Sequence, residues 1–162
     1  GELGRGVHRV ADAFGMTVLP SARPGSDAVP EGRVAFDEVL ARADVISLHC
    51  PLTDVTRELF DATTIARMKR GAFLINTARG AIIDSVALVA ALDSGQLAGA
   101  AIDVLAQEPP TDGDPLLDYR GNNLVITPHI AWATAEARQA AIDELAANAA
   151  AFLAGTQRCR VV

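Results

Sequence analysis

Residues 72–104 read AFLINTARGAIIDSVALVAALDSGQLAGAAIDV, and this stretch decides the fold. The apolar run Ala72–Ala78 is followed by SVALVAALDS, which Asp84 can cap at its N-terminus and Gly95 can end. A second apolar run, Ala98–Val104, comes next. Near-continuous apolar runs that alternate with helical segments are typical of parallel strands covered by helices on both faces. The stretch therefore predicts a strand, a helix and a second strand of one parallel sheet.

The same alternation extends in both directions along the chain. The other predicted elements are a helix ending at Gly15, a strand over Met16–Pro20, a loop over Ser21–Gly32, a helix around Phe36–Ala43, a strand over Asp44–Cys50, a helix over Asp61–Lys69, a loop over Glu108–Asp118, a strand over Leu124–Pro128 and a long helix over roughly Thr134–Ala154. An apolar stripe runs along this last helix, formed by Ile142, Leu145, Ala149, Phe152 and Leu153. The predicted fold class is α/β, with a doubly wound parallel sheet.

Size, charge and cysteine content narrow the class of protein. The chain has 162 residues, enough for one domain with a sizeable core, and that core must be aliphatic because aromatic residues make up only 4%. A net charge of −6 argues against nucleic acid or an anionic membrane as the main partner. Cys50 and Cys159 are too few for a disulfide framework, and no apolar run approaches the ~18 residues of a membrane span. Without a signal peptide either, a cytoplasmic protein is expected.

Polar residues follow the predicted strands where ligands bind in such sheets, beyond the carboxyl ends. Thr77 and Arg79 follow one strand, Asp103 ends the next and precedes Glu108, and His129 follows the last. Alone, Arg79 is more simply a surface arginine, Glu108 a solvated glutamate and His129 a loop histidine. For Asp103 a structural hydrogen bond and a ligand contact are about equally expected. Together they favour an active site, because a guanidinium can bind a carboxylate and a histidine beside a carboxylate can act as a general acid.

Other chemistries find little support in the sequence. There is no G-x-S-x-G motif for a serine nucleophile, and no histidines or cysteines have the spacing of metal ligands. His49 lies inside an apolar run and is expected in the core, whereas His8 is expected to be solvated. Trp132, three residues after His129, is expected near the mouth of the site.

Three ordered motifs carry a family resemblance. NTARG at 76–80, AAIDVLAQEPP at 100–110 and TPHIAW at 127–132 closely resemble the D-2-hydroxyacid dehydrogenase family. QEPPTDGDPLL and HIAWAT are most similar to its glycerate dehydrogenase, or hydroxypyruvate reductase, branch. The resemblance covers essentially the whole chain. It implies a Rossmann NAD(P)-binding domain, with the active site in a cleft between this domain and a substrate domain.

The resemblance also implies roles for the residues at the sheet edge. Arg79 would hold the carboxylate and carbonyl of the substrate, and His129 would protonate the ketone oxygen as hydride arrives. Glu108 would pair with His129 and keep it protonated, and Asp103 would accept a hydrogen bond from the nicotinamide carboxamide. The further cofactor-binding residues expected on this basis are Cys50, Pro51, Thr56, Thr77, Ala78 and Ala131, with Trp132 near the substrate.

The family's glycine fingerprint is only half present at the start of the chain. GELGRG places Gly1 at its second glycine and Gly4 at its third, with Glu2 and Leu3 beside the pyrophosphate, and leaves Gly6 as an ordinary helix residue. The first strand and the substrate domain are expected to lie before residue 1, and residues from about 153 to 162 resemble the family's C-terminal return segment. On this basis the 162-residue chain alone is expected to be poorly active.

The cofactor-selecting position departs from the common NAD pattern. An Asp or Glu usually binds the ribose 2′-hydroxyl of NAD about 20 residues after the fingerprint, but Ala22 and Arg23 stand there. Arg23 could pair with a 2′-phosphate or simply face solvent. NAD and NADP both remain open as cofactors.

The resemblance leaves the reaction and the assembly as hypotheses. An oxidoreductase that reduces hydroxypyruvate or glyoxylate is expected, with Glu108 arguing against the formate dehydrogenase relatives. The alternative is a corepressor-like regulator that binds a dinucleotide without turnover, since such relatives keep the same Arg, Glu and His. A homodimer formed through this domain is expected.

Overall fold

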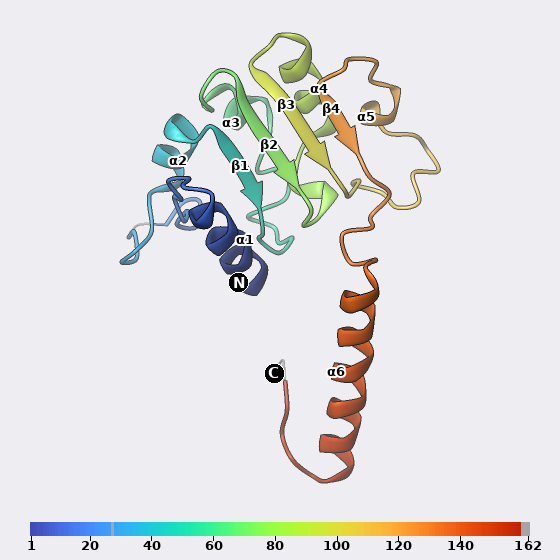
Figure 1. The fold of residues 1–162 in the computed structure, drawn as a ribbon. Coiled ribbons are helices and arrows are strands. Elements are labelled where there is room, and N and C mark those ends of the chain that lie inside the picture. Colours follow the sequence, from blue (N-terminus) through green and yellow to red (C-terminus); the bar gives the residue numbers. More distant parts are fainter. Residues whose placement is uncertain (27, 160–162) are drawn as a thin grey trace. The chain divides into compact units, whose positions relative to one another are not determined.

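Four parallel strands form the sheet on which residues Gly1–Pro128 are built (Figure 1). They are β1 (Val45–Leu48), β2 (Ala72–Asn76), β3 (Leu97–Ile102) and β4 (Leu124–Ile126), and they lie side by side in chain order. The computed structural model describes residues 1–26 and 28–159 of the chain. Within these it forms two compact units, one up to Pro128 and one from His129 onward.

Helices connect the strands, and aspartates fix where three of them begin. The helical elements of the first unit are α1 (Glu2–Ala13), α2 (Phe36–Arg42), α3 (Ala62–Ala66), the 3₁₀ turn η1 (Gly80–Ile82), α4 (Ser85–Asp93) and α5 (Pro115–Asp118). The side chains of Asp61, Asp84 and Asp114 accept hydrogen bonds from the first backbone amides of α3, α4 and α5. The expected Asp84 cap is confirmed, and Gly95 follows α4 with φ +68°.

The core is formed by the sheet together with residues of the helices α2, α3, α4 and α5 (Figure 1). It is aliphatic, as the composition predicts, and its most deeply buried members include Leu40, Leu74, Leu88 and Leu97. Phe60 adds an edge-to-face contact with Phe36, with ring centres 6.1 Å apart. The sheet is therefore anchored from one side by a continuous apolar cluster.

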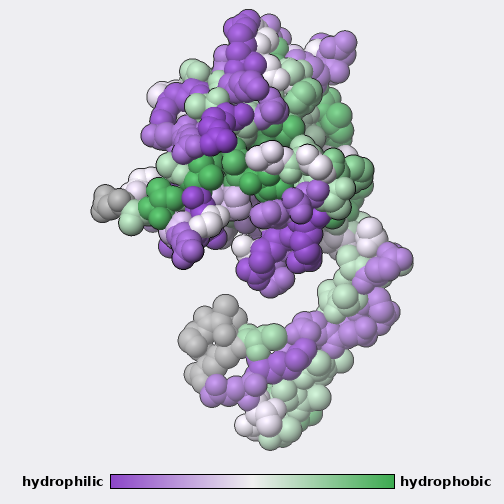
Figure 2. Space-filling view, turned by 60° about the vertical axis from the view of Figure 1, so that its left-hand side comes forward, coloured by the Kyte–Doolittle hydropathy of each residue, from purple (hydrophilic) through white to green (hydrophobic). Residues whose placement is uncertain are grey.

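The opposite face of the sheet is less covered within this unit. Ser47 and His49 point to that side of β1, where α1 packs, but Phe73 is 48% and Val125 61% exposed. Val7 and Val10 of α1 are exposed too, and Phe14, directly after the helix, is 82% exposed. Figure 2 shows hydrophobic surface gathered between hydrophilic areas of the molecule. Some of the apolar side chains that predict these elements are therefore exposed on this face of the unit.

One predicted strand is wrong. Met16–Pro20 forms no strand, and the neighbouring Ser21 makes only an isolated bridge to Val34. A strand needs a ladder of hydrogen bonds with a neighbour, and Met16–Pro20 has no such ladder among the residues that the structure describes. The other predicted elements are confirmed with shifted ends, and α5 occupies part of the predicted loop Glu108–Asp118.

The second unit is built on one long helix, α6 (Ala135–Leu153). Thr134 caps it by accepting a hydrogen bond from the Ala137 amide, and Arg158 turns back to pair with Glu144 at 2.6 Å. The predicted apolar stripe is exposed, with Phe152 at 83%. Of the predicted return segment 153–162, residues 160–162 lie outside the described part. No helix among the described residues is long and apolar enough to cross a membrane.

Candidate functional site: the carboxyl edge of the sheet

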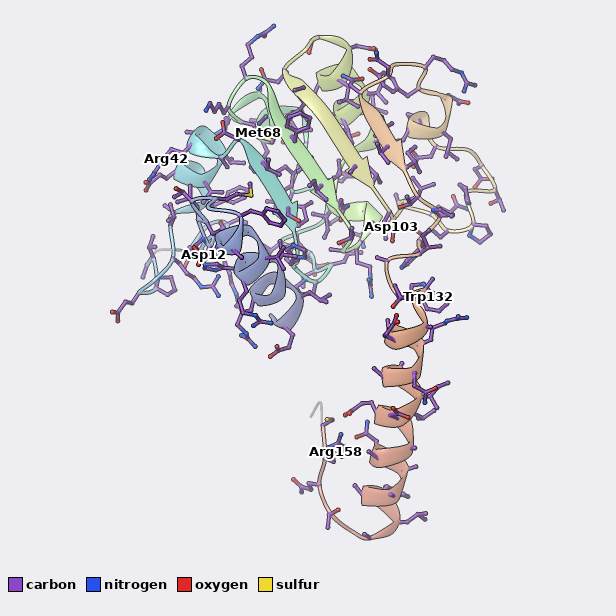
Figure 3. All side chains as sticks on the ribbon, in the orientation of Figure 1. Asp12, Arg42, Met68, Asp103, Trp132 and Arg158 are labelled. Carbon is purple, nitrogen blue, oxygen red and sulfur yellow. The ribbon has the colours of Figure 1, made fainter. Side chains whose placement is uncertain are left out.

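The carboxyl ends of β1, β2 and β3 meet at one edge because the strands are parallel. His49 and Cys50 follow β1, Thr77 follows β2, and Asp103, labelled in Figure 3, follows β3. Cys50, Thr77 and Asp103, all predicted site residues, therefore lie where the fold class places ligands.

A pocket of about 380 Å³ opens at this edge. Its lining comes from the start of α1 and from the segments after β1 and β2: Leu3, His49, Cys50, Pro51, Leu52, Thr77, Ala78 and Arg79. The structure thus brings together Leu3, Cys50–Pro51 and Thr77–Arg79, all predicted from the sequence. His49 and Leu52 join them without having been expected there.

The first turn of α1 forms one wall of the pocket. Gly1 is its N-cap residue, and Glu2 pairs with Arg5 on the exposed side of the helix. A Cβ added to Gly4 would lie 3.5 Å from the Cβ of His49, which is an ordinary van der Waals contact. The helix thus packs closely on β1, and the backbone N–H groups of a helix's first turn suit an anionic group.

Burial changes the titration of two groups beside this wall. Partial burial lowers the pKa of His49. Its Nε2 also lies 2.9 Å from the Ser47 hydroxyl oxygen. Burial raises the pKa of the Cys50 thiol. The expectation of a core histidine at position 49 is therefore wrong in part: the ring is half-buried, because β1 ends there and the next side chains line the pocket.

The turn after β2 presents Arg79. Its guanidinium is exposed and donates from Nη1 to the Ala78 carbonyl at 2.6 Å. The turn itself is held by Asn76, a fully buried residue that sequence reasoning did not single out. In the sequence, Asn76 stands out as a polar residue inside an apolar run, but it was used only as part of the NTARG motif.

Asp103 ties together the ends of three strands. It is 5% exposed, its amide donates to the Asn76 carbonyl at 2.9 Å, and its carboxylate accepts from the Thr127 hydroxyl. The sequence allowed either a structural hydrogen bond or a ligand contact for Asp103. A buried carboxylate whose hydrogen bonds are satisfied fits the structural role. Both roles are compatible, because a carboxylate has several acceptor positions.

Glu108 closes the loop that follows β3. Its side chain is exposed, and Oε1 accepts a hydrogen bond from the Leu105 amide at 2.7 Å. The carboxylate is therefore fixed near the sheet edge instead of pointing freely into solvent.

A second, smaller pocket of about 170 Å³ contains the predicted cofactor-selecting residues. It is lined by Ala22, Arg23, Gly25, Ser26, Val29, Ala35, Phe36 and Asp37. Ala22 is buried and its amide donates to the Val34 carbonyl at 2.8 Å, whereas Arg23 is exposed. Asp37 pairs with Arg67 at 2.6 Å, so the negative charge of Asp37 is balanced outside the pocket lining. The positive charge of Arg23 in the lining is therefore not cancelled by Asp37.

Thr56 is placed differently from the other predicted cofactor residues. It is buried, its hydroxyl donates to the Pro51 carbonyl at 2.8 Å, and it accepts from the Thr53 amide at 2.8 Å. These bonds shape the loop that carries Cys50 and Pro51, so its contribution is to the form of the pocket wall.

The remaining predicted residues belong to the second unit. His129 has φ +53°, and its carbonyl accepts a hydrogen bond from the Trp132 indole at 2.8 Å. Trp132 is 60% exposed and Ala131 is exposed as well. No group of three or more His, Cys, Asp or Glu side chains that could hold a metal ion occurs in the described residues.

The parallel sheet, the helix N-terminus at its edge and the two pockets define a Rossmann-type dinucleotide-binding domain. Residues 1–131 match the family described as "D-isomer specific 2-hydroxyacid dehydrogenase, NAD binding domain". The chain belongs to this family.

Known proteins agree with that assignment. The chain is 46% identical to a glycerate dehydrogenase of Methylorubrum extorquens, over 96% of this chain and 48% of that protein. The crystal structure of the TT0316 protein from Thermus thermophilus is 42% identical and covers all of this chain and 51% of that one, with a TM-score of 0.84. An acyclic imino acid reductase in complex with NADPH and D-Arg is 31% identical, with a TM-score of 0.85, over 100% of this chain and 51% of that one. This chain spans about half the length of these relatives.

Proposed function

We propose that this chain is the nicotinamide-dinucleotide-binding part of an oxidoreductase acting on small D-2-hydroxy acids, of the glycerate dehydrogenase or hydroxypyruvate reductase type. The observation that carries the proposal is the pocket of about 380 Å³ at the carboxyl edge, with Arg79 in its wall. A relative 46% identical is named a glycerate dehydrogenase, which supports the substrate class.

The residues of the pocket fit a dinucleotide. The first turn of α1 offers backbone N–H groups to a diphosphate, and Gly4 lies close to His49 in the pocket wall. Cys50, Pro51, Thr77 and Ala78 would line the cofactor, and Asp103 would accept a hydrogen bond from the carboxamide. When bound, the nicotinamide ring supplies the hydride.

The protein's own part in the reaction is to bind, orient and protonate. In the proposal, the Arg79 guanidinium holds the substrate carboxylate through paired hydrogen bonds. His129, three residues beyond the end of β4, delivers a proton to the ketone oxygen, and Glu108 stabilises the protonated imidazole. In the reverse direction His129 accepts the alcohol proton.

The test is turnover by the gene product that carries this sequence. We expect it to oxidise NADH or NADPH with hydroxypyruvate and with glyoxylate, followed through the absorbance of the reduced nicotinamide, and to use D-glycerate but not L-glycerate in reverse. Dinucleotide binding with no turnover of any 2-keto acid would instead favour the regulatory alternative. Absence of dinucleotide binding would contradict both.

We also propose that residues 1–162 form one dinucleotide-binding domain, and that efficient catalysis needs a further domain on the other side of the active-site cleft. Relatives of this chain are about twice as long, and the apolar side chains of α1 are exposed, which supports a further protein surface beside this domain. Purified residues 1–162 should therefore bind the dinucleotide but reduce hydroxypyruvate poorly. Efficient reduction by this chain alone would contradict the proposal.

Replacing Arg23 with alanine tests the choice of cofactor. If Arg23 pairs with the 2′-phosphate of NADP, R23A should weaken NADPH binding about tenfold or more and leave NADH binding nearly unchanged, since a charge-assisted hydrogen bond contributes roughly 1.5–3 kcal/mol. Isothermal titration calorimetry with both cofactors gives the two dissociation constants. R33A is the control, because Arg33 is exposed nearby and donates to the Ser21 carbonyl at 2.7 Å. A strong preference of the unchanged protein for NADH would refute the hypothesis.

We also propose that the protein forms a homodimer and acts in the cytoplasm. The exposed Phe152 and Leu153 on α6 and the exposed apolar face of α1 support contact with a further protein surface. Light scattering of the purified gene product should give the mass of a dimer, and a monomeric mass would contradict the dimer.

A further inference from the structure

Asn76 is a polar side chain with no solvent exposure, placed at the end of β2. Its Nδ2 donates to the Arg79 carbonyl at 2.9 Å, and its Oδ1 accepts from the Ala78 amide at 3.0 Å. Both ends of the amide are thus engaged across the turn that carries Arg79. A buried amide whose donor and acceptor are both satisfied has one stable orientation, because any rotation leaves a buried polar group unpaired.

At Gly80 this turn packs directly against the turn that follows β3. A Cβ built on Gly80 would lie 1.9 Å from the carbonyl carbon of Leu105 and 2.4 Å from the amide nitrogen of Ala106. The backbones of the two turns therefore touch directly, with no side chain between them. Since Arg79 precedes Gly80 in the chain, the position of Leu105 limits where the Arg79 backbone can lie.

The contact continues to Glu108. The Leu105 amide donates to Glu108 Oε1 at 2.7 Å, and the Asp103 amide donates to the Asn76 carbonyl at 2.9 Å. Hydrogen bonds and one backbone contact thus form an unbroken path from Asn76 to the carboxylate of Glu108. Asp103, at the start of the second turn, is marked in Figure 3.

We propose that Asn76 and Gly80 are positioning residues that hold the turns of Arg79 and Glu108 as one rigid unit. The consequence rests on the proposed function: the guanidinium that binds the substrate carboxylate and the carboxylate that pairs with the general acid keep a fixed relation. Misplacement by about 1 Å lowers the rate of such a reaction about a hundredfold, so a rigid link between the two groups has a direct catalytic use.

Amide hydrogen exchange tests the rigid unit without any need for turnover. Because the Glu108 side chain is exposed, E108A and E108Q should both fold, and only E108A removes the acceptor for the Leu105 amide. We expect E108A to speed exchange about tenfold at Leu105 and also at Ala78, across the Gly80 contact, whereas E108Q changes neither. Residue-resolved exchange by NMR on the 162-residue chain measures both. If E108A speeds amide exchange at Leu105 but leaves the exchange rate at Ala78 unchanged, the proposal is overturned.

Steady-state kinetics of N76D test the catalytic consequence. The substitution keeps the size of the side chain and the acceptor for Ala78 but removes the donor to the Arg79 carbonyl. In the gene product that carries this sequence we expect KM for the 2-keto acid to rise about tenfold or more, with the dissociation constant of the dinucleotide within about twofold. Loss of folded protein alone would lower kcat and leave KM unchanged, and that result would overturn the catalytic role.

N123D is the matched control. Asn123 also engages both ends of its amide, with Tyr119 and Leu92, but it precedes β4 at the opposite edge of the sheet. N123D should alter neither exchange at Ala78 nor KM, and a rise equal to that of N76D would overturn the proposal. If the unchanged protein shows no turnover, the proposed function fails, and the exchange experiment still decides whether the two turns form one unit.

Discussion

Replacing His129 with asparagine should lower kcat for the reduction of hydroxypyruvate about a thousandfold, because a positioned general acid contributes a factor of roughly 10²–10⁴. The ketone oxygen gains negative charge as hydride arrives at its carbon, and His129 is the proposed proton donor. The asparagine amide can still donate a hydrogen bond but cannot give up a proton near neutral pH. The dissociation constant of the dinucleotide should change little, so the effect falls on the chemical step.

H8N is the control for this prediction. His8 is exposed on α1, and its replacement should leave kcat within about twofold, as expected of a surface substitution. Steady-state kinetics of the gene product that carries this sequence, with saturating dinucleotide, measure both variants. Retention of more than about a tenth of kcat by H129N would exclude the assigned role, since a tenfold loss is smaller than the general-acid contribution.

Replacing Gly80 with alanine should produce the largest loss of stability among single methyl additions to this chain. The added Cβ would lie 1.9 Å from the carbonyl carbon of Leu105 and 2.1 Å from its oxygen, and both are backbone atoms that cannot rotate away. The loops after β2 and β3 must separate, which we expect to lower the free energy of unfolding by about 3 kcal/mol. For a chain of this size that corresponds to a fall in Tm of roughly 6–12 °C.

G6A adds the same methyl group and should have the opposite effect on the free energy of unfolding. Gly6 lies inside α1, and a Cβ there would meet no atom within 4 Å among the described residues. Alanine in a helix interior should raise the free energy of unfolding by roughly 0.5–1 kcal/mol, because glycine loses more conformational freedom on folding. Urea unfolding followed by circular dichroism gives both values, and G80A as stable as G6A would contradict the close contact between the two turns.

Local sequence patterns were reliable where their cause is local. The helix α4 begins after Asp84 because that side chain accepts two backbone amides, and it ends near Gly95, which takes the left-handed conformation. The strands β2 and β3 begin and end within two residues of the apolar runs that predict them, because both are buried beside neighbouring strands. Met16–Pro20 failed because a strand also requires a partner, which no apolar pattern guarantees.

The candidate site shows the same division. The order of strands and polar residues places Thr77, Arg79 and Asp103 at one edge, because parallel strands end on the same side. That His49 lines the pocket instead of lying in the core was not predictable, since it depends on where β1 ends and on α1 packing beside it. Thr56 was expected at the cofactor and is bonded within its own loop.

The sequence by itself determined the fold class, the family and the edge at which the chemistry-bearing residues gather, because periodicity, capping residues and motif order act over short stretches of chain. Only the tertiary structure decided how those residues are held. The bond from Asn76 to the Arg79 carbonyl, the contact of Gly80 with Leu105 and the bond from Leu105 to Glu108 join turns after two different strands. Such contacts depend on the distance between backbones after packing, and residue order along the chain does not encode that distance directly.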